Sequence, residues 1–151
     1  MNTATHPLAT LPCLCANLRR ATRAVTQLYE EALRPLGLRA TQFTILQVLD
    51  RTGKITQGKL GELLATDSTT LTRTIQIMCR NGWVAEQPGA DRRERWLRLA
   101  KAGRAQLVRA TPAWEKVQSQ LAQALGREPW RNLFTLTGEV ASLASSQGDL
   151  S

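Results

Sequence analysis

Hydroxyl side chains crowd into one short stretch of the chain, residues 67–74, which read DSTTLTRT. Serine and threonine are mediocre helix formers because their hydroxyls compete for backbone hydrogen bonds. The stretch nevertheless leads into Leu71, Ile75 and Met78, whose spacing is that of the buried stripe of a helix. Short hydroxyl groups at the start of a helix allow close approach to DNA and can bond base edges and phosphates. The stretch therefore predicts a helix that enters a major groove; the simpler alternative is a cap at Asp67 or Ser68 beside a neutral surface.

Polar side chains gather opposite the apolar stripe when residues 68–80 are drawn on a helical wheel. The start of the helix adds partial positive charge, and Arg73 can reach a guanine edge or a phosphate. The candidate DNA-binding residues of this helix are Ser68, Thr69, Thr70, Thr72, Arg73, Gln76 and Arg80.

A second short helix is expected just before this one. Thr56 can cap a helix over 57–65, in which Leu60, Leu63 and Leu64 are expected to face inward. The three residues 66–68 then form a tight turn, so the two helices predict a helix-turn-helix unit. Asn81-Gly82 is a typical stop for the second helix.

A hairpin is expected directly downstream. Residues 83–87 (WVAEQ) and 93–99 (RERWLRL) are strand-like, and the turn Pro88-Gly89-Ala90-Asp91 separates them. The tip carries Asp91, Arg92 and Arg93. A hairpin tipped with arginine after a helix-turn-helix is the arrangement of a winged helix, whose wing can insert an arginine into the minor groove.

Long helices flank this unit on both sides. Apolar residues at four-three spacing predict a helix over 12–36, and Thr41 is expected to cap the next one. A helix over 101–125 contains Pro112, which should kink it, and Pro129 opens a last helix.

The run from Thr56 through DSTTLTRT, NGWV and PGADRRERWLRLA resembles the winged-helix core of the MarR family, the multiple-antibiotic-resistance type of bacterial repressor. The wing pattern of that family is Asp, one residue, then Arg, followed by a strand that ends Leu-Thr. Asp91 and Arg93 match the pattern, whereas Leu99-Ala100 departs from it by one hydroxyl. The flanking helices extend the resemblance over residues 12–148.

The resemblance implies a mainly α fold with a small β-hairpin wing, built as one domain over 12–148 after a flexible tail (1–11). Its parts would be a winged-helix DNA-binding lobe (41–100) and dimerisation helices (12–36 and 101–148). It also implies a homodimeric repressor on a pseudo-palindromic DNA operator. The long apolar stripes of the flanking helices independently favour two-fold pairing.

The resemblance also assigns roles within the wing. Arg93 would enter the minor groove, and Asp91 would hold that arginine in position. Arg92 and Arg95 are candidate phosphate contacts, with solvated hairpin charges as the alternative.

Repressors of this family are released by a small phenolic or aromatic ligand or by cysteine oxidation. Cys15 precedes Tyr29 by the spacing found in the organic-hydroperoxide sensors of the family, but other tyrosines of those sensors fall here on Arg19 and Ala40. Cys13 could act as resolving partner; on a regular helix the two cysteines would lie on different faces, so a bond within one chain would require local unwinding. Small buried hydrophobes, or a soft-metal site on C-x-C, remain alternatives.

For a ligand, a crevice between helices could be lined by Arg19, Tyr29, Phe43 and Trp114, with core packing as the alternative for the last two. A ligand effector and an oxidised Cys15 are thus both open.

Composition narrows the class of protein. The chain has 151 residues and a net charge of +8, from 20 Lys and Arg against 12 Asp and Glu, which favours a polyanionic partner. No catalytic constellation occurs, so the sequence predicts neither an enzyme nor a cofactor nor a resident metal. No run approaches the roughly 18 apolar residues of a membrane span, and the first residues do not look like a secretory signal. Together with only three cysteines, these features predict a cytoplasmic protein; a non-specific architectural DNA-binding protein is the second reading.

Overall fold

The computed structural model describes residues 11–148, with side chains through residue 143. The tail predicted for residues 1–11 lies outside the described residues except for its last one. The described chain divides into two compact units, and the boundary along the chain lies between Ala113 and Trp114. Each unit is described by itself.

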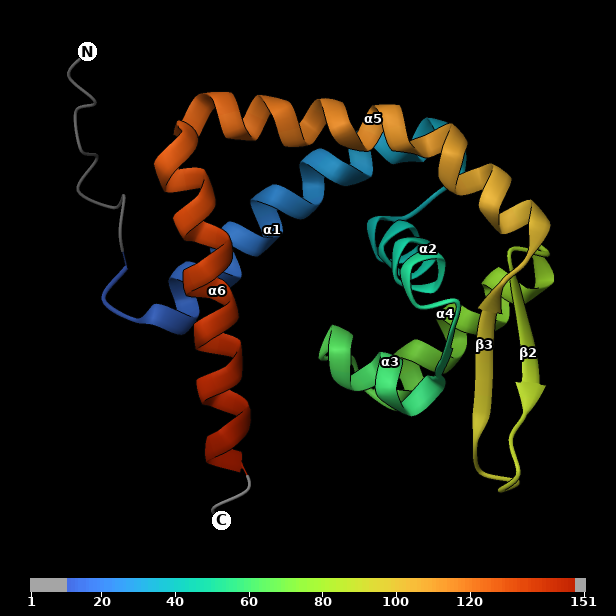
Figure 1. Cartoon of the computed structure of the whole chain (residues 1–151). Coiled ribbons are helices and arrows are strands. Elements are labelled where there is room, and N and C mark those ends of the chain that lie inside the picture. Colours follow the sequence, from blue (N-terminus) through green and yellow to red (C-terminus); the bar gives the residue numbers. More distant parts are fainter. Residues whose placement is uncertain (1–10, 149–151) are drawn as a thin grey trace. The chain divides into compact units, whose positions relative to one another are not determined.

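The first unit contains a helical lobe and a small sheet (Figure 1). Its helices are α1 (Leu14–Leu33), the 3-10 helix η1 (Arg34–Leu36), α2 (Ala40–Thr52), α3 (Gln57–Leu64) and α4 (Ser68–Arg80). Its strands are β1 (Lys54–Thr56), β2 (Val84–Pro88) and β3 (Arg95–Leu99). Helix α5 (Lys101–Leu125) begins in this unit and ends in the other, which also holds α6 (Arg127–Gly148). The predicted fold class, mainly α with a small β-hairpin wing, is confirmed.

The sheet is antiparallel with the order β1-β3-β2. The predicted hairpin is formed by β2 and β3, and Figure 1 shows it extending beyond the helices of the lobe. We call residues 84–99 the wing. Strand β1 adds a third member, since Ile55 pairs with Leu97 in the centre of β3. Because Leu97 is fully buried, this pairing anchors the base of the wing to the helical core.

The core of the lobe comes from the apolar faces of its helices. Phe43, Leu46 and Leu49 of α2 are at most 1% exposed, and so is Leu60 of α3. The predicted stripe of α4, Leu71, Ile75 and Met78, is buried as well. Burial of this stripe fixes which face of α4 remains on the surface.

Helix α2 begins differently from the prediction. Thr41 does not cap it, since the N-cap is Arg39 in an extended conformation. The first free amide, that of Ala40, donates to Glu30 Oε1 of α1 at 2.9 Å, and the Arg39 amide donates to the side chain of Gln42. A carboxylate at a helix N-terminus satisfies a backbone donor and interacts favourably with the helix dipole. The first amide of α2 is therefore satisfied by a contact between two helices, and not by the local cap predicted from the sequence.

The prediction that Leu63 faces inward is wrong, because its side chain is 62% exposed. Leu60 and Leu64 are four residues apart and share the inner face of α3, whereas Leu63 lies on its flank. The predicted cap is present, since Thr56 Oγ1 accepts the Lys59 amide at 3.3 Å.

The start of α1 also differs from the prediction, because Cys13 is the N-cap and has an extended backbone. The side chain of Asn17 bonds both the amide and the carbonyl of Leu11 and also donates to the Cys13 carbonyl at 2.9 Å. These bonds tie Leu11 and Cys13 to the first turn of α1, with a bend at Pro12. Cys13 therefore lies outside the regular helix that contains Cys15. A bond between the two cysteines would not require the helix to unwind at Cys13.

The start of α5 packs closely against the turn that ends α4. Gly82 has a φ of 71°, which only glycine adopts easily and which reverses the chain after α4. The Trp83 carbonyl that follows accepts the Ala100 amide at 2.9 Å. A Cβ on Gly103 would collide with the same carbonyl oxygen, so a glycine is required there.

Helix α5 continues past Pro112 without interruption, and the division between the units follows one residue later. In the second unit α6 begins at Arg127, two residues before the predicted Pro129, after Gly126 with a φ of 89°. Trp130 and Phe134 of α6 stack edge to face with ring centroids 5.0 Å apart.

Candidate nucleic-acid interface

The exposed face of α4 carries a cluster of hydrogen-bonding side chains. A hollow of about 360 Å³ on this face is lined by Ser68, Thr69, Thr72, Arg73 and Gln76. All of them were candidates from the sequence. The burial of the opposite stripe holds this face outward, as a helix that enters a groove requires.

The first turn of α4 is held by Asp67. Its Oδ1 accepts the Thr70 amide at 2.9 Å. Hydrogen bonds from the Thr70 hydroxyl and amide are the main causes that lower the pKa of the Asp67 carboxyl. The capping alternative is therefore correct for Asp67, but the cap leaves Ser68, Thr69, Arg73 and Gln76 exposed and Thr72 half-buried.

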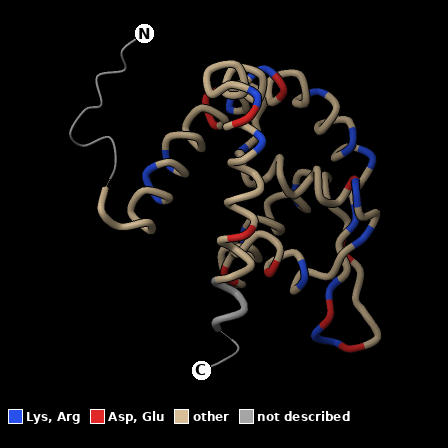
Figure 2. Tube along the Cα trace, turned by 60° about the vertical axis from the view of Figure 1, so that its left-hand side comes forward, with Lys and Arg blue, Asp and Glu red and all other residues tan. Residues whose placement is uncertain are grey.

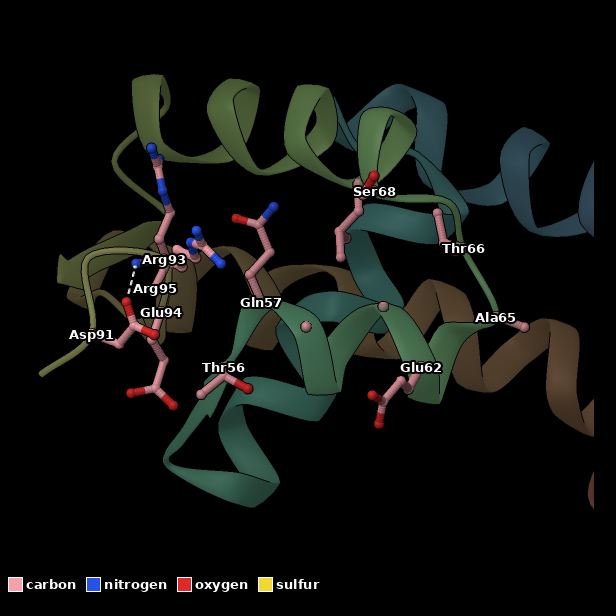
Figure 3. Close-up of a pocket in the computed structure, with 13 residues that line it drawn as sticks. Thr56, Gln57, Glu62, Ala65, Thr66, Ser68, Asp91, Arg93, Glu94 and Arg95 are labelled. Carbon is pink, nitrogen blue, oxygen red and sulfur yellow. Dashed lines mark hydrogen bonds between the residues drawn. The ribbon is translucent and has the colours of Figure 1, made fainter. Parts of the chain in front are cut away.

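A second, larger hollow lies between the wing and the starts of α3 and α4 (Figure 3). Its volume is about 700 Å³. The wing contributes Asp91, Arg93, Glu94 and Arg95, while Thr56, Gln57, Gly58, Gly61, Glu62, Ala65, Thr66, Ser68 and Leu71 come from the helix-turn-helix unit and the residue before it. Ser68 lines both hollows, so the two are adjacent.

The tip of the wing is ordered by its own hydrogen bonds. Asp91 Oδ1 accepts the amide of Arg93 at 3.0 Å, the bond drawn in Figure 3. The Gly89 amide donates to the Glu94 carbonyl at 2.7 Å and closes the loop. Asp91 thus fixes the backbone at Arg93, while the Arg93 side chain stays exposed.

The other wing arginines differ from Arg93 in their surroundings. Arg95 forms an ion pair with Glu86 on the neighbouring strand. The Arg95 side chain is 58% exposed and that of Glu86 is 29% exposed, so this pair contributes little to stability and Arg95 can exchange it for a phosphate. Arg92, together with Thr70 and Arg80 of α4, is exposed and lines neither hollow.

Gln57 is a functional candidate that sequence reasoning missed. Its Nε2 donates to Thr72 Oγ1 at 2.8 Å, and its side chain also lines the larger hollow. The local sequence marks Gln57 only as the first residue of α3. The contact joins residues fifteen positions apart, so no helical or strand period predicts it.

The distribution of charge agrees with a solvated, mainly basic surface. Figure 2 shows basic and acidic positions side by side at the tip of the wing. On α1, Arg19, Arg20 and Arg23 line a hollow of about 380 Å³ with Ala16.

The candidate sensor residues fall in different environments. Cys13 and Cys15 are free and exposed, and Arg19 Nη2 lies 3.7 Å from Cys15 Sγ. Tyr29 is half-buried, and burial raises the pKa of its phenol. Phe43 is in the core of the lobe and Trp114 belongs to the second unit.

Cys79 is less accessible than the other two cysteines, and burial, with a smaller effect of the Glu86 charge, raises the pKa of its thiol. Among residues 11–148, no three His, Cys, Asp or Glu side chains gather as a metal site would require. Within that same range, no helix combines the length and the apolar character needed to span a lipid bilayer.

The sequence and the fold both match known proteins. The model of the MarR family matches residues 38–94. The uncharacterized HTH-type transcriptional regulator YwoH of Bacillus subtilis is 33% identical over 88 residues, which are 58% of this chain and 64% of that relative. That match therefore spans less than two thirds of YwoH.

Two solved structures match over most of their length. The transcriptional regulator MosR of M. tuberculosis, in complex with DNA, is 35% identical with a TM-score of 0.79, over 89% of this chain and 97% of that one. A mutant MarR from E. coli, complexed with operator DNA, is 25% identical with a TM-score of 0.75, over 84% of this chain and 92% of that one. The chain belongs to the MarR family of transcriptional regulators.

Proposed function

We propose that the chain is a sequence-specific regulator of transcription that binds double-stranded DNA as a homodimer and represses from a pseudo-palindromic operator. The observation that carries this proposal is the exposed polar face of α4 next to an ordered wing with an exposed Arg93. The MosR and MarR structures with DNA support the same assignment.

In this proposal α4 enters the major groove and the wing reaches the adjacent minor groove. The hydroxyl, amide and guanidinium groups of α4 bond base edges and phosphates. Arg93 inserts into the minor groove, because a narrow minor groove attracts a guanidinium, and Asp91 fixes the backbone from which it extends.

Exposed apolar side chains support the homodimer. On α1, Leu14 is 62% exposed and Leu28 is 43% exposed, and on α6 Leu133, Phe134 and Leu136 are also exposed. Such a density of exposed apolar groups on two helices is typical of an interface between subunits. A second copy would cover these groups and place two α4 helices about one DNA turn apart.

The DNA-binding proposal is tested with Arg93→Ala, measured by footprinting and fluorescence anisotropy on the genomic fragment around the chain's own gene. The wild type is expected to protect an inverted repeat. Arg93→Ala is expected to cost about 1–3 kcal/mol of binding free energy and to reduce the preference for sites with a narrow minor groove. Arg51→Ala is the control, since it removes the same charge from an exposed site outside both hollows. If Arg93→Ala and Arg51→Ala weaken binding equally, the wing has no specific role in DNA binding. If the wild type protects the whole fragment uniformly, the chain is better described as a non-specific architectural DNA-binding protein.

For the signal that releases DNA, we propose oxidation at Cys15. The thiol is exposed, so a small oxidant can reach it, and Arg19 Nη2 lies 3.7 Å from its sulfur. A hydroperoxide would transfer its terminal oxygen to this sulfur, forming a sulfenic acid and releasing an alcohol. The Cys13 thiol could then attack that sulfur, forming a disulfide and releasing water.

The test is operator affinity before and after mild treatment with cumene hydroperoxide. The wild type is expected to lose affinity, and Cys15→Ser is expected to abolish the loss. Cys79→Ser serves as control and should respond like the wild type. A response that persists in Cys15→Ser, or a wild type that does not respond, would favour a small phenolic ligand near Tyr29, the other release signal.

A further inference from the structure

Thr72 is bonded differently from other threonines of the helices. Many of these hydroxyls donate to a backbone carbonyl four residues earlier, namely those of Thr44, Thr52, Thr74, Thr111, Thr135 and Thr137. Thr72 Oγ1 instead accepts a hydrogen bond from Gln57 Nε2 at 2.8 Å. Within the described part of the chain, no carbonyl takes the hydroxyl proton of Thr72.

This bond decides what the Thr72 hydroxyl can offer to a ligand. A free hydroxyl is one donor and two acceptors, and it rotates to suit its partner. Because the side-chain amide of Gln57 donates to Thr72 Oγ1, the hydroxyl proton of Thr72 must point away from Gln57. The bond from Gln57 also polarises the hydroxyl and makes it a better donor.

The Thr72 hydroxyl lies where a ligand bound to α4 could accept its proton. Thr72 lines the hollow on the exposed face of α4 together with Arg73 and Gln76. Gln57 stands behind it, at the start of α3, with its side chain directed toward α4 (Figure 3). The chain of bonds therefore runs from α3 through Thr72 toward the face that meets DNA.

We propose that Gln57 is a positioning residue that makes Thr72 a hydrogen-bond donor to DNA. The inference rests on the proposed DNA-binding function and adds a rule of specificity to it. Thr72 selects an acceptor, either on a base edge (guanine O6 or N7, adenine N7, thymine O4) or on a phosphate oxygen. A donor such as the cytosine or adenine amino group is disfavoured rather than excluded, because one lone pair of the Thr72 oxygen is still available.

The test is a double-mutant cycle on Gln57 and Thr72. The wild-type protein first selects its binding site from a random-sequence duplex library. Dissociation constants are then measured on the selected duplex and on a scrambled duplex. Thr72→Val and Gln57→Leu are each expected to weaken binding to the selected duplex about tenfold, counting both subunits of a dimer. If the Thr72 partner is a base, both variants should bind the scrambled duplex as the wild type does; if it is a phosphate, both should lose affinity for the two duplexes by the same factor.

The double variant distinguishes a relay from two separate effects. If Gln57 acts through Thr72, Gln57→Leu will cost nothing further in the Thr72→Val background. Thr72→Ser keeps the hydroxyl and should retain most of the affinity. Losses that simply add, or an unchanged affinity of Gln57→Leu, would overturn the proposal.

Gln57→Glu reverses the polarity and gives a second, independent measurement. The carboxylate accepts the Thr72 proton, so the hydroxyl can then only accept from DNA. The added negative charge should weaken binding to both duplexes, whereas the reversed hydroxyl, if its partner is a base, should weaken binding to the selected duplex alone. Gln57→Glu is therefore expected to lose more affinity for the selected duplex than for the scrambled one. In the Thr72→Val background this difference should vanish. If the difference persists, the added charge alone explains the variant and the relay is refuted.

Single base-pair changes in the selected duplex identify the acceptor. If the Thr72 partner is a base, Thr72→Val will become indifferent to one base pair; if it is a phosphate, the loss will be uniform over sequences. If the library yields no selected site, both the proposed function and this inference fail. If a site is selected but Thr72→Val binds it normally, only this inference fails.

Discussion

The junction between α1 and α2 offers a quantitative prediction, because one carboxylate joins the two helices. Glu30 Oε1 accepts the first free amide of α2, that of Ala40, at 2.9 Å, and its Oε2 lies 3.2 Å from Arg39 Nη1. The Glu30 side chain is 18% exposed, whereas that of Arg39 is 71% exposed. We therefore expect the amide bond, rather than the ion pair, to supply most of the stabilisation.

The expected magnitudes follow from these exposures. A hydrogen bond to a charged group contributes about 1.5–3 kcal/mol, and a carboxylate at a helix N-terminus adds less than about 1 kcal/mol when partly solvated. Allowing for residual solvent access, Glu30→Ala should lower the free energy of unfolding by about 2 kcal/mol. Arg39→Ala should cost about 0.5 kcal/mol or less, because an exposed ion pair is screened. Glu30→Gln keeps an acceptor and should fall between the two.

The assay is urea unfolding followed by circular dichroism at one fixed protein concentration, since the stability of a dimer depends on concentration. For a domain of this size, the loss in Glu30→Ala corresponds to a fall in Tm of about 4–8 °C. If Glu30→Ala and Arg39→Ala lose equal stability, the ion pair would be the principal contact and the reasoning from exposure would be refuted. A Glu30→Gln variant as unstable as Glu30→Ala would show that charge, not the hydrogen bond, holds the junction.

Two further predictions concern the thiols and a close backbone contact. Iodoacetamide at neutral pH should alkylate Cys13 and Cys15 before Cys79, whose raised thiol pKa leaves less thiolate until the pH rises; equal rates by mass spectrometry would contradict this. Gly103→Ala should destabilise the protein by more than about 2 kcal/mol because its Cβ meets a backbone carbonyl, whereas Gly138→Ala, with open space around it, should be neutral or stabilising. Similar Tm values for the two alanine variants would refute the contact.

Local patterns in the sequence were sufficient for much of the fold. The spacing of Leu71, Ile75 and Met78 gave the buried side of α4, and therefore also its exposed side. Turn residues predicted the wing, since Gly89 and Asp91 lie in the reversal between β2 and β3; Pro88, assigned to the turn from the sequence, is instead the last residue of β2 and pairs with Arg95. The polar face of α4 could be predicted for the same reason, because a helix with one buried stripe has only one opposite face.

Long-range contacts were beyond such patterns. Thr41 was expected to cap α2, but the N-cap is Arg39, and Glu30 of α1 accepts the first free amide of α2. Leu63 was expected inside, but α3 is too short to bury more than one narrow face. Neither error could be found locally, because each depends on which other element packs against the helix.

The sequence by itself therefore determined the kinds of elements, their order and the chemical types of side chain on the exposed face of α4. Period, caps and turns act over a few residues, and the identity of those residues decides them. Only the tertiary structure decided that the Gln57 amide bonds the Thr72 hydroxyl, and that β1 joins β3 at the base of the wing. Such contacts arise when burial of the shared core brings distant segments together, and their geometry depends on the packing of all the helices at once.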